Sequence, residues 1–194
     1  MPRRSARERI LEASVILFAE RGYRHTTTKM IADWAGVNEV TLFRHFGTKE
    51  GIVKGIIQSR SSSQGEVRHV LDENSTGDLY EDLLKVARIQ YKYLSANLKL
   101  LVTLVQESPP ESDLASSISV LPRSIKDIIV AYFQRMQASG KMRPVDPEEA
   151  AVVFMTPTFG FTFMKGFFGN AVTSLTAEEH VVTSVRNFVD AVRM

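Results

Sequence analysis

Hydrophobic residues recur every three or four positions along most of this chain, and no long stretch alternates apolar and polar residues as a strand does. The first 60 residues are predicted to form four short helices. Ser5 and Glu8 form a capping pattern at the start of the first helix, and Gly22 follows its end. Thr48 is expected to cap the fourth helix, which runs from residue 48 to residue 61.

Beyond residue 61 the same spacing predicts longer helices, with polar breaks at residues 61–65 and 72–77. These helices are expected near residues 78–94, 97–107, 124–139, 146–168 and 177–194. Residues 97–107 are nearly all apolar, which indicates burial on most sides. Asp146-Pro147 marks a helix start, and Pro157 is expected to kink or interrupt that helix. The predicted fold class is all-α.

The stretch from Thr26 to Glu50 contains two short helices joined by a tight turn at Gly36. In the second of these helices, Leu42 and Phe46 lie four residues apart and are expected to face inward. The remaining side chains form a mixed polar outer face. They are Glu39, Val40, Thr41, Arg44 and His45. Two helices arranged in this way are typical of a helix-turn-helix.

The same stretch resembles a known family of DNA-binding regulators. Its motif is Ile31-Ala32-x-x-Ala35-Gly36-Val37-Asn38-x-x-Thr41-Leu42-Phe43-x-His45-Phe46-x-x-Lys49-Glu50, preceded by Gly22-Tyr23 and Thr26-Thr27-Thr28. This motif resembles the DNA-binding signature of the tetracycline-repressor-type (TetR-like) regulators. The resemblance implies a three-helix DNA-binding head at residues 1–50, linked by helix 48–61 to a helical ligand-binding and dimerisation domain at residues 51–194.

The sequence departs from the family pattern at three positions. Val40 stands where a small residue is common, and Phe43 replaces a frequent tyrosine whose hydroxyl can meet a phosphate. Gly51 weakens the usual polar start of the fourth helix. Gly51 and Gly55 each lower helix propensity by about 1 kcal/mol. Two interpretations remain open. Either the two glycines make the fourth helix flexible, so that it transmits movement between the two domains, or they are small residues that allow close packing.

The resemblance and the chemistry of the outer face together give a set of expected DNA contacts. These residues are Thr26, Thr27, Thr28, Lys29, Asn38, Glu39, Val40, Thr41, Phe43, Arg44, His45 and Lys49. Glu39 has the chemistry to accept from a cytosine amino group, and Arg44 to bind guanine or phosphate. The threonines and Lys49 suit phosphate contacts at helix starts. Alternatively, Glu39 only offsets the helix dipole and Lys49 is a solvated charge.

Charge is unevenly distributed along the 194 residues, although the net charge is only +2. Residues 1–60 carry 11 Lys and Arg against 6 Asp and Glu, whereas residues 61–194 carry 13 against 16. A basic N-terminal part suits a polyanion such as double-stranded DNA, although chance unevenness explains the numbers equally well. Arg3, Arg4 and Arg7 are either phosphate contacts or solvated charges. The chain lacks a signal peptide and any long uncharged apolar run, which predicts a cytoplasmic protein that does not span a membrane.

The C-terminal apolar helices are expected to bind an effector and form a homodimer. The candidate effector-binding residues are Leu101, Val105, Phe133, Met155, Phe159 and Phe163. The candidate dimer residues, on the last helix, are Val181, Val185, Phe188, Val189 and Val192. Because residues 150–164 carry no ionisable side chain, a small and largely apolar effector is predicted. The alternative for the same phenylalanines is that they form core and dimer interface.

No pattern for catalysis is present. The sequence has no cysteine, its four histidines have no metal-ligand spacing, and it lacks a glycine-rich phosphate loop or a Gly-x-Ser-x-Gly elbow. We therefore expect no catalytic residues, metal or cofactor. The predicted function is a dimeric one-component transcriptional repressor that binds a near-palindromic operator. The alternative is a helical ligand-binding or interaction protein whose head no longer binds DNA, with Val40 and Phe43 as its signs.

Overall fold

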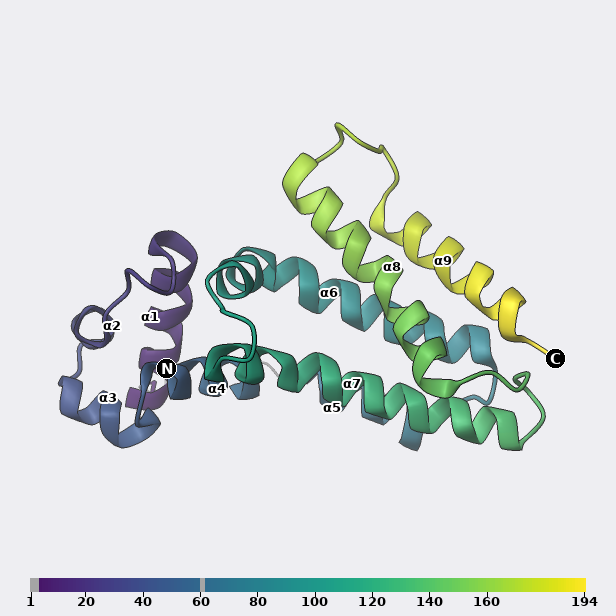
Figure 1. Ribbon diagram of the computed structural model, residues 1–194, viewed down its shortest axis with the longest axis horizontal. Helices are drawn as coiled ribbons and strands as arrows, with labels where there is room; N and C mark the ends of the chain where they lie inside the picture. The colour runs from purple at the N-terminus through teal and green to yellow at the C-terminus, as the bar shows by residue number, and fades with distance from the viewer. Residues whose placement is uncertain (1–3, 60–61) are drawn as a thin grey trace. The chain divides into compact units, whose positions relative to one another are not determined.

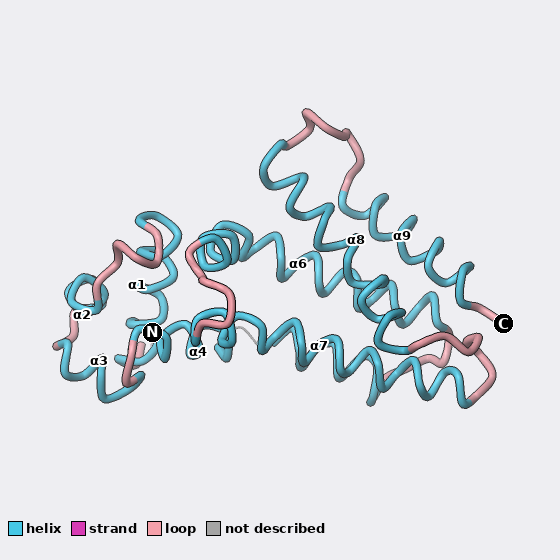
Figure 2. Tube along the Cα trace, viewed as in Figure 1, coloured by secondary structure: helices cyan, strands magenta, loops and turns pink. Residues whose placement is uncertain are grey.

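The computed structural model describes residues 4–59 and 62–194, and no strand occurs among them (Figures 1 and 2). The helices are α1 (Ala6–Arg21), α2 (Thr28–Ala35), α3 (Glu39–Phe46), α4 (Lys49–Ser59), α5 (Ser62–Arg68), the π-helical turn η1 (His69–Glu73), α6 (Leu79–Gln106), α7 (Asp113–Ala138), α8 (Pro147–Phe168) and α9 (Ala177–Val192). The prediction of an all-α fold is confirmed.

Short-range signals in the sequence predict the starts of α1, α8 and α9 correctly. Ser5 and Thr176 each form a capping box, with Glu8 and Glu179 as their partners, at the starts of α1 and α9. Asp146 accepts a hydrogen bond from the Glu149 amide at 2.7 Å, with Pro147 in the first turn of α8. In each case a side-chain oxygen satisfies an amide that has no partner inside the helix.

Several predicted helix boundaries differ from the structure, and the helices expected at residues 78–94 and 97–107 form one continuous helix, α6. The stretch 62–65 lies inside α5 and does not form a loop. Helix α7 begins eleven residues before the expected position 124 and runs through Pro122. Pro157 does not interrupt α8, and its carbonyl oxygen accepts a hydrogen bond from Nε2 of His180 at 3.1 Å. Burial of the flanking apolar residues outweighs the single backbone hydrogen bond that each proline removes.

The chain divides into two compact units. The first comprises Met1–Ser61 and Lys99–Leu121, and the second comprises Ser62–Leu98 and Pro122–Met194. Helices α6 and α7 therefore each contribute residues to both units. This division differs from the boundary expected at residue 50, because α4 packs with α1 and α3 in the first unit.

The core of the second unit contains most residues that were expected at a dimer interface. Val181, Val185, Val189 and Val192 are all buried within the chain itself. Phe188 stacks on Phe133 at 5.6 Å between ring centroids and lies 5.4 Å from Phe154. The apolar stripe of α9 thus packs on α7 and α8. Helix α8 lies beside α9 in Figure 1. The four valines are therefore core residues of the subunit, whereas Phe188 is half-buried, and their part in a dimer interface stays a prediction.

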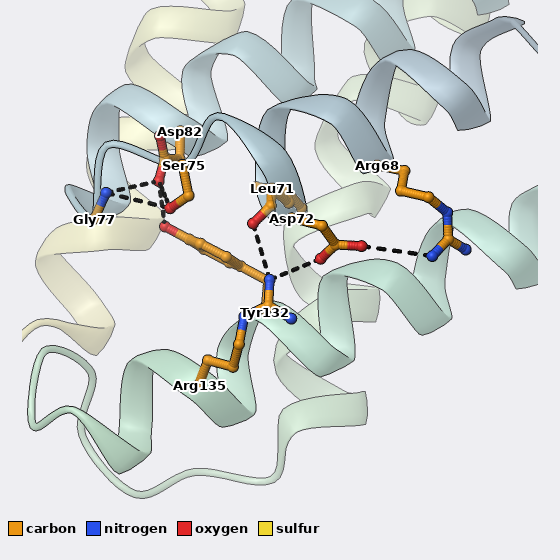
Figure 3. Close-up of polar contacts among 8 residues, drawn as sticks. All are labelled: Arg68, Leu71, Asp72, Ser75, Gly77, Asp82, Tyr132 and Arg135. Atoms are coloured by element: carbon orange, nitrogen blue, oxygen red, sulfur yellow. Dashed lines mark hydrogen bonds and ion pairs between the residues drawn. The ribbon is translucent and has the colours of Figure 1, made fainter.

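A fully buried carboxylate, Asp82, ties α6 to α7 in the second unit (Figure 3). It accepts hydrogen bonds from the Ser75 hydroxyl, the Thr76 amide and hydroxyl, the Gly77 amide and the Tyr132 hydroxyl, at 2.6–3.3 Å. Burial alone would raise the pKa of Asp82, but these donors outweigh that effect and hold the pKa below its ordinary value. The same burial raises the pKa of the Tyr132 hydroxyl.

Replacing Tyr132 with phenylalanine should lower the free energy of unfolding at pH 7 by about 1–3 kcal/mol, because a buried carboxylate loses one donor. The lowered pKa of Asp82 contributes stability above its unfolded value, and this contribution is lost as the pH falls through the folded value. The variant should therefore begin to lose this stability at a higher pH than the wild type. Urea titrations at pH 7 and pH 4 measure both effects. Tyr91→Phe is the control, because that hydroxyl bonds to no other described residue.

Candidate nucleic-acid interface

The helix-turn-helix is built from α2, α3 and the turn between them. Thr27 caps α2 by accepting from the Met30 amide at 3.2 Å, and Asn38 caps α3 by accepting from the Val40 amide at 2.9 Å. Gly36 adopts a left-handed backbone with φ of 61°, which costs glycine least. Nη1 of Arg9 in α1 donates to the Gly36 carbonyl oxygen at 3.3 Å. The caps of α2 and α3 and the hydrogen bond from Arg9 of α1 thus all stabilise the turn.

The outer face of α3 carries the side chains expected to contact DNA. Val40 is 72% exposed, and Phe43, Arg44 and His45 are also exposed, while Thr41 is half-buried. Leu42 is buried and Phe46 half-buried, as predicted from their spacing. Among the described residues, no ion pair engages Arg44, His45 or the exposed Lys29 of α2. These cations are available to phosphate groups or base edges.

Glu39 and Thr28 are brought together by the packing of α2 on α3. The Thr28 hydroxyl donates to Oε1 of Glu39 at 2.5 Å, and both side chains are half-buried. Glu39 also lies in the first turn of α3, where a negative charge offsets the helix dipole. Thr28 therefore orients the carboxylate and leaves its second oxygen without a hydrogen bond to any described residue.

Thr26 was wrongly placed among the phosphate contacts. Its side chain is fully buried, and its hydroxyl donates to the carbonyl oxygens of Gly22 and Leu17, at 2.7 and 3.2 Å. The residue closes the turn between α1 and α2. Of the cations at the N-terminus, Arg4 pairs with Glu12 and Arg7 lies over the Phe46 ring, whereas Arg3 lies outside the described residues.

Lys49 points toward the turn after α1. Its ammonium donates to the Tyr23 carbonyl oxygen and lies 4.1 Å from the centroid of the Tyr23 ring. Burial lowers the pKa of Lys49, although Glu50 and Glu107 oppose this effect. The Tyr23 hydroxyl in turn donates to Glu50 at 2.7 Å. Lys49 thus has a positioning contact inside the first unit, and a phosphate contact remains a prediction.

Glu107, which follows the last residue of α6, was not among the residues predicted to matter. Its carboxylate accepts from the Arg24 amide at 2.5 Å and lies against Gly22, where an added Cβ would approach it to 2.4 Å. This contact joins the end of α6 to the turn between α1 and α2 within the first unit. A separation of 83 residues along the chain leaves no local pattern that could have revealed it.

The two unusual glycines of α4 are sites of close packing. A Cβ on Gly51 would lie 1.9 Å from the Phe46 carbonyl oxygen. A Cβ on Gly55 would lie 2.7 Å from the Phe46 ring and 3.1 Å from Leu11. These distances favour the packing interpretation of both residues over a flexible helix.

The residues expected to line an effector pocket are distributed over both units. Leu101 and Val105 belong to the first unit, where Leu101 is half-buried and Val105 is exposed. In the second unit, Phe133 is part of the core and Met155 is half-buried. Phe159 and Phe163 stack on each other on an outer face of α8, with Phe159 49% exposed. Phe133 is thus a core residue and Val105 and Phe159 are exposed, so an effector pocket at these residues stays a prediction.

Helix α8 carries more exposed large apolar side chains than any other described helix. They are Val152, Val153, Phe159, Phe167 and Phe168, each about half exposed. At 100° per residue Val152, Phe159 and Phe167 share one side, the outer face of α8, whereas Phe168 points to the side opposite Phe159. Gly160 lies beside them and has open space at its Cβ position. Clusters of exposed apolar side chains often mark contacts with other molecules.

The three-helix head, with its capped turn and exposed basic face on α3, defines a helix-turn-helix transcription factor. Residues 10–56 match the model for bacterial regulatory proteins of the tetR family. Residues 82–192 match the model for the C-terminal domain of AefR-like transcriptional repressors. The chain belongs to the TetR family of transcriptional regulators and is not an enzyme.

Individual relatives agree with this assignment. HTH-type transcriptional regulator YvkB of Bacillus subtilis is 32% identical over 189 residues, covering 97% of this chain and 98% of that protein. HTH-type transcriptional repressor AcnR of Corynebacterium efficiens is 24% identical, covering 94% and 93%. The structure of FadR from Bacillus subtilis in complex with stearoyl-CoA has a TM-score of 0.77 at 19% identity, covering 94% of this chain and 97% of that chain. This likeness shows the fold alone.

Family members are soluble DNA-binding proteins that usually act as dimers. Within the described residues, α8 alone has the length and apolar composition that could cross a membrane. Core helices of soluble proteins pass the same test. This one weakly apolar helix is therefore not evidence of a membrane span.

Proposed function

We propose that this protein is a cytoplasmic repressor that binds a near-palindromic DNA operator as a homodimer and responds to a small, largely apolar effector. The observation that carries this proposal is the exposed face of α3, where Arg44, His45 and Val40 flank a carboxylate that Thr28 orients. Relatives named as repressors, such as AcnR, support the direction of regulation. We propose Thr27, Thr28, Lys29, Asn38, Thr41 and Phe43 as further contacts.

The proposed dimer uses the exposed face of α8. Phe159, Phe163 and Phe167 form a ladder of ring contacts at 5.2 and 5.4 Å, and Gly160 allows a second helix to approach closely. The same face on two subunits would form a self-complementary two-fold interface. Two heads would then meet half-sites one DNA turn apart, or a multiple of that distance.

The effector is proposed to bind in the second unit. The structure of FadR from Bacillus subtilis, which has a similar fold, was determined in complex with stearoyl-CoA, a ligand with a long apolar acyl chain and a charged CoA group. In this chain, α8 carries no ionisable side chain between Glu149 and Lys165. A charged group of a ligand buried against this segment would therefore have no oppositely charged partner on α8. The effector changes operator affinity only to the extent that it binds the two conformations unequally.

Selection of bound fragments from genomic DNA tests the proposed function directly. Fluorescence anisotropy with a recovered fragment should show affinity that falls steeply with salt. Arg44→Ala should weaken binding about tenfold and reduce the salt slope by about one unit if Arg44 contacts a phosphate. Lys92→Ala, which removes an exposed cation from α6, should change neither value. A wild-type protein that recovers no fragment would support the alternative function, a ligand-binding protein whose head no longer binds DNA.

Glu39→Ala should change base preference at one operator position by about 1–3 kcal/mol, because a direct acceptor for cytosine is lost. Thr28→Val keeps the carboxylate but removes the hydroxyl that orients it. This control should weaken the preference without changing which base is preferred. Binding to a set of operators with single substitutions measures both variants. Equal weakening on every sequence would assign Glu39 to structure alone.

A further inference from the structure

Two amide side chains lie at the centre of the buried face of α6 without complete hydrogen bonding. Gln90 is 6% exposed and Asn97 is 8% exposed. Oε1 of Gln90 and Oδ1 of Asn97 are both buried, and neither accepts a hydrogen bond from any described residue. The two residues are seven positions apart, or about two helical turns and 10 Å along the axis, so they point in the same direction.

The orientation of the Asn97 amide is fixed by its nitrogen. Nδ2 donates to the Tyr93 carbonyl oxygen at 2.7 Å, so the atom left without a partner is the oxygen. A carbonyl oxygen can only accept a hydrogen bond. The group that would satisfy Asn97 must therefore be a donor, such as a hydroxyl or an N–H.

Neighbouring contacts show which sector of the second unit these oxygens face. Asp82 lies about 80° around α6 from Gln90 on one side, and it bonds to Tyr132 of α7. Tyr91 lies about 100° around on the other side, and its ring is 6.4 Å from that of Phe161 in α8. Gln90 and Asn97 thus point into the sector between the α7 contact and the α8 contact.

The same helix shows how this protein treats a buried polar group that serves structure. Asp82 is equally buried, yet it accepts five hydrogen bonds from four residues. An unpaired buried acceptor lowers stability, and an apolar side chain of the same shape would remove that cost. Two unpaired acceptors on one face of α6, beside a fully paired carboxylate, lower the stability of the folded protein. Such a cost is expected at a site that binds a ligand.

We propose that Gln90 and Asn97 are acceptors for the effector, which therefore carries hydroxyl or N–H donors on an otherwise apolar body. This inference rests on the proposed function, because it specifies the chemistry of that effector. One elongated molecule lying along α6 would reach both oxygens. Fatty acyl chains without hydroxyl groups have no donor to offer at these positions, so the proposed effector differs in this respect from a simple saturated acyl chain.

The first test needs no ligand. Gln90→Met and Asn97→Leu replace each amide with an apolar side chain of similar size, and each variant should unfold at a temperature about 2–4 °C higher than the wild type. Asp82→Asn is the contrast, because it alters a satisfied buried group and should lower the unfolding temperature. If both amide variants unfold at the wild-type temperature or below it, the amides have a structural or water-mediated role and the proposal is overturned.

The second test uses matched pairs of probes. Unbranched diols with six to ten carbons are compared with their dimethyl ethers, which keep the oxygens but lack donors, by calorimetric titration of the full-length protein. The wild type should bind at least one diol about tenfold more tightly than its ether, equivalent to about 1.4 kcal/mol. The double variant Gln90→Met/Asn97→Leu should lose that preference and bind the ether as tightly as the diol, because it lacks both acceptors. Absence of any preference in the wild type, or the same preference in the variant, overturns the proposal.

Operator binding by the same proteins separates this inference from the proposed function. Gln90 and Asn97 lie in the second unit, so both amide variants should bind the operator with wild-type affinity when no probe is present. A wild type that binds DNA but fails both amide tests would overturn the inference and leave the repressor function standing. A wild type that binds no DNA would overturn the repressor function, whatever the probes do.

Discussion

Replacing Phe159 and Phe167 with aspartate is expected to convert the dimer into monomers and to lower operator affinity by about 100-fold or more. Both rings are about half exposed on the outer face of α8, so the substitutions leave the core of the subunit intact. In a two-fold interface, however, each change would place a charge on both sides of an apolar contact, at high cost. A monomer then loses the gain in operator affinity, about 10²–10⁴-fold, that comes from linking two DNA-binding heads.

Sedimentation velocity at micromolar concentration and anisotropy on the operator measure the two consequences. Ser95→Asp with Ala96→Asp is the matched control, because it adds the same charge to exposed positions of α6 in the same unit. Val185→Asp should behave differently: this residue is buried within the subunit, so the change should lower the unfolding temperature. A wild-type protein that sediments as a monomer, or a double variant that remains dimeric, would contradict the proposed interface.

Elements that depend on neighbouring residues were predictable from the sequence. The capping residues Ser5, Asp146 and Thr176 act within three positions, and Gly36 acts through its own backbone. The helix-turn-helix shares this local character, because inward Leu42 and outward Arg44 follow from one helical period. The candidate DNA-binding face was therefore largely predictable from the order of its residues.

Contacts between distant segments were not predictable in the same way. An apolar stripe such as that of α9 has the same pattern whether it packs inside one subunit or between two, and the structure places it inside. The buried hydroxyl of Thr26 and the contact of Glu107 with Arg24 depend on how helices meet. Periodicity identifies the face of a helix, but it does not identify the partner of that face.

Gly51→Ala is expected to be among the most disruptive single substitutions in the head. The new Cβ would lie 1.9 Å from the Phe46 carbonyl oxygen, far inside van der Waals contact. That oxygen belongs to the backbone and accepts from the Thr48 amide at 2.8 Å, so it cannot move without disturbing the start of α4. We expect a loss of about 3 kcal/mol or more, at the upper end of overpacking effects, together with loss of operator binding.

Gly65→Ala supplies the matched control for this change. Gly65 also lies inside a helix, α5, and among the described residues no atom beyond its chain neighbours and the backbone of its own helix lies within 4 Å of its Cβ position. Alanine there should raise stability by about 0.5–1 kcal/mol, because glycine is the weaker helix former. Urea unfolding of both variants gives the comparison, and anisotropy reports the state of the head. If Gly51 instead served as a hinge, Gly51→Ala would keep wild-type stability and basal operator affinity while blunting the response to effector, and the packing explanation would be wrong.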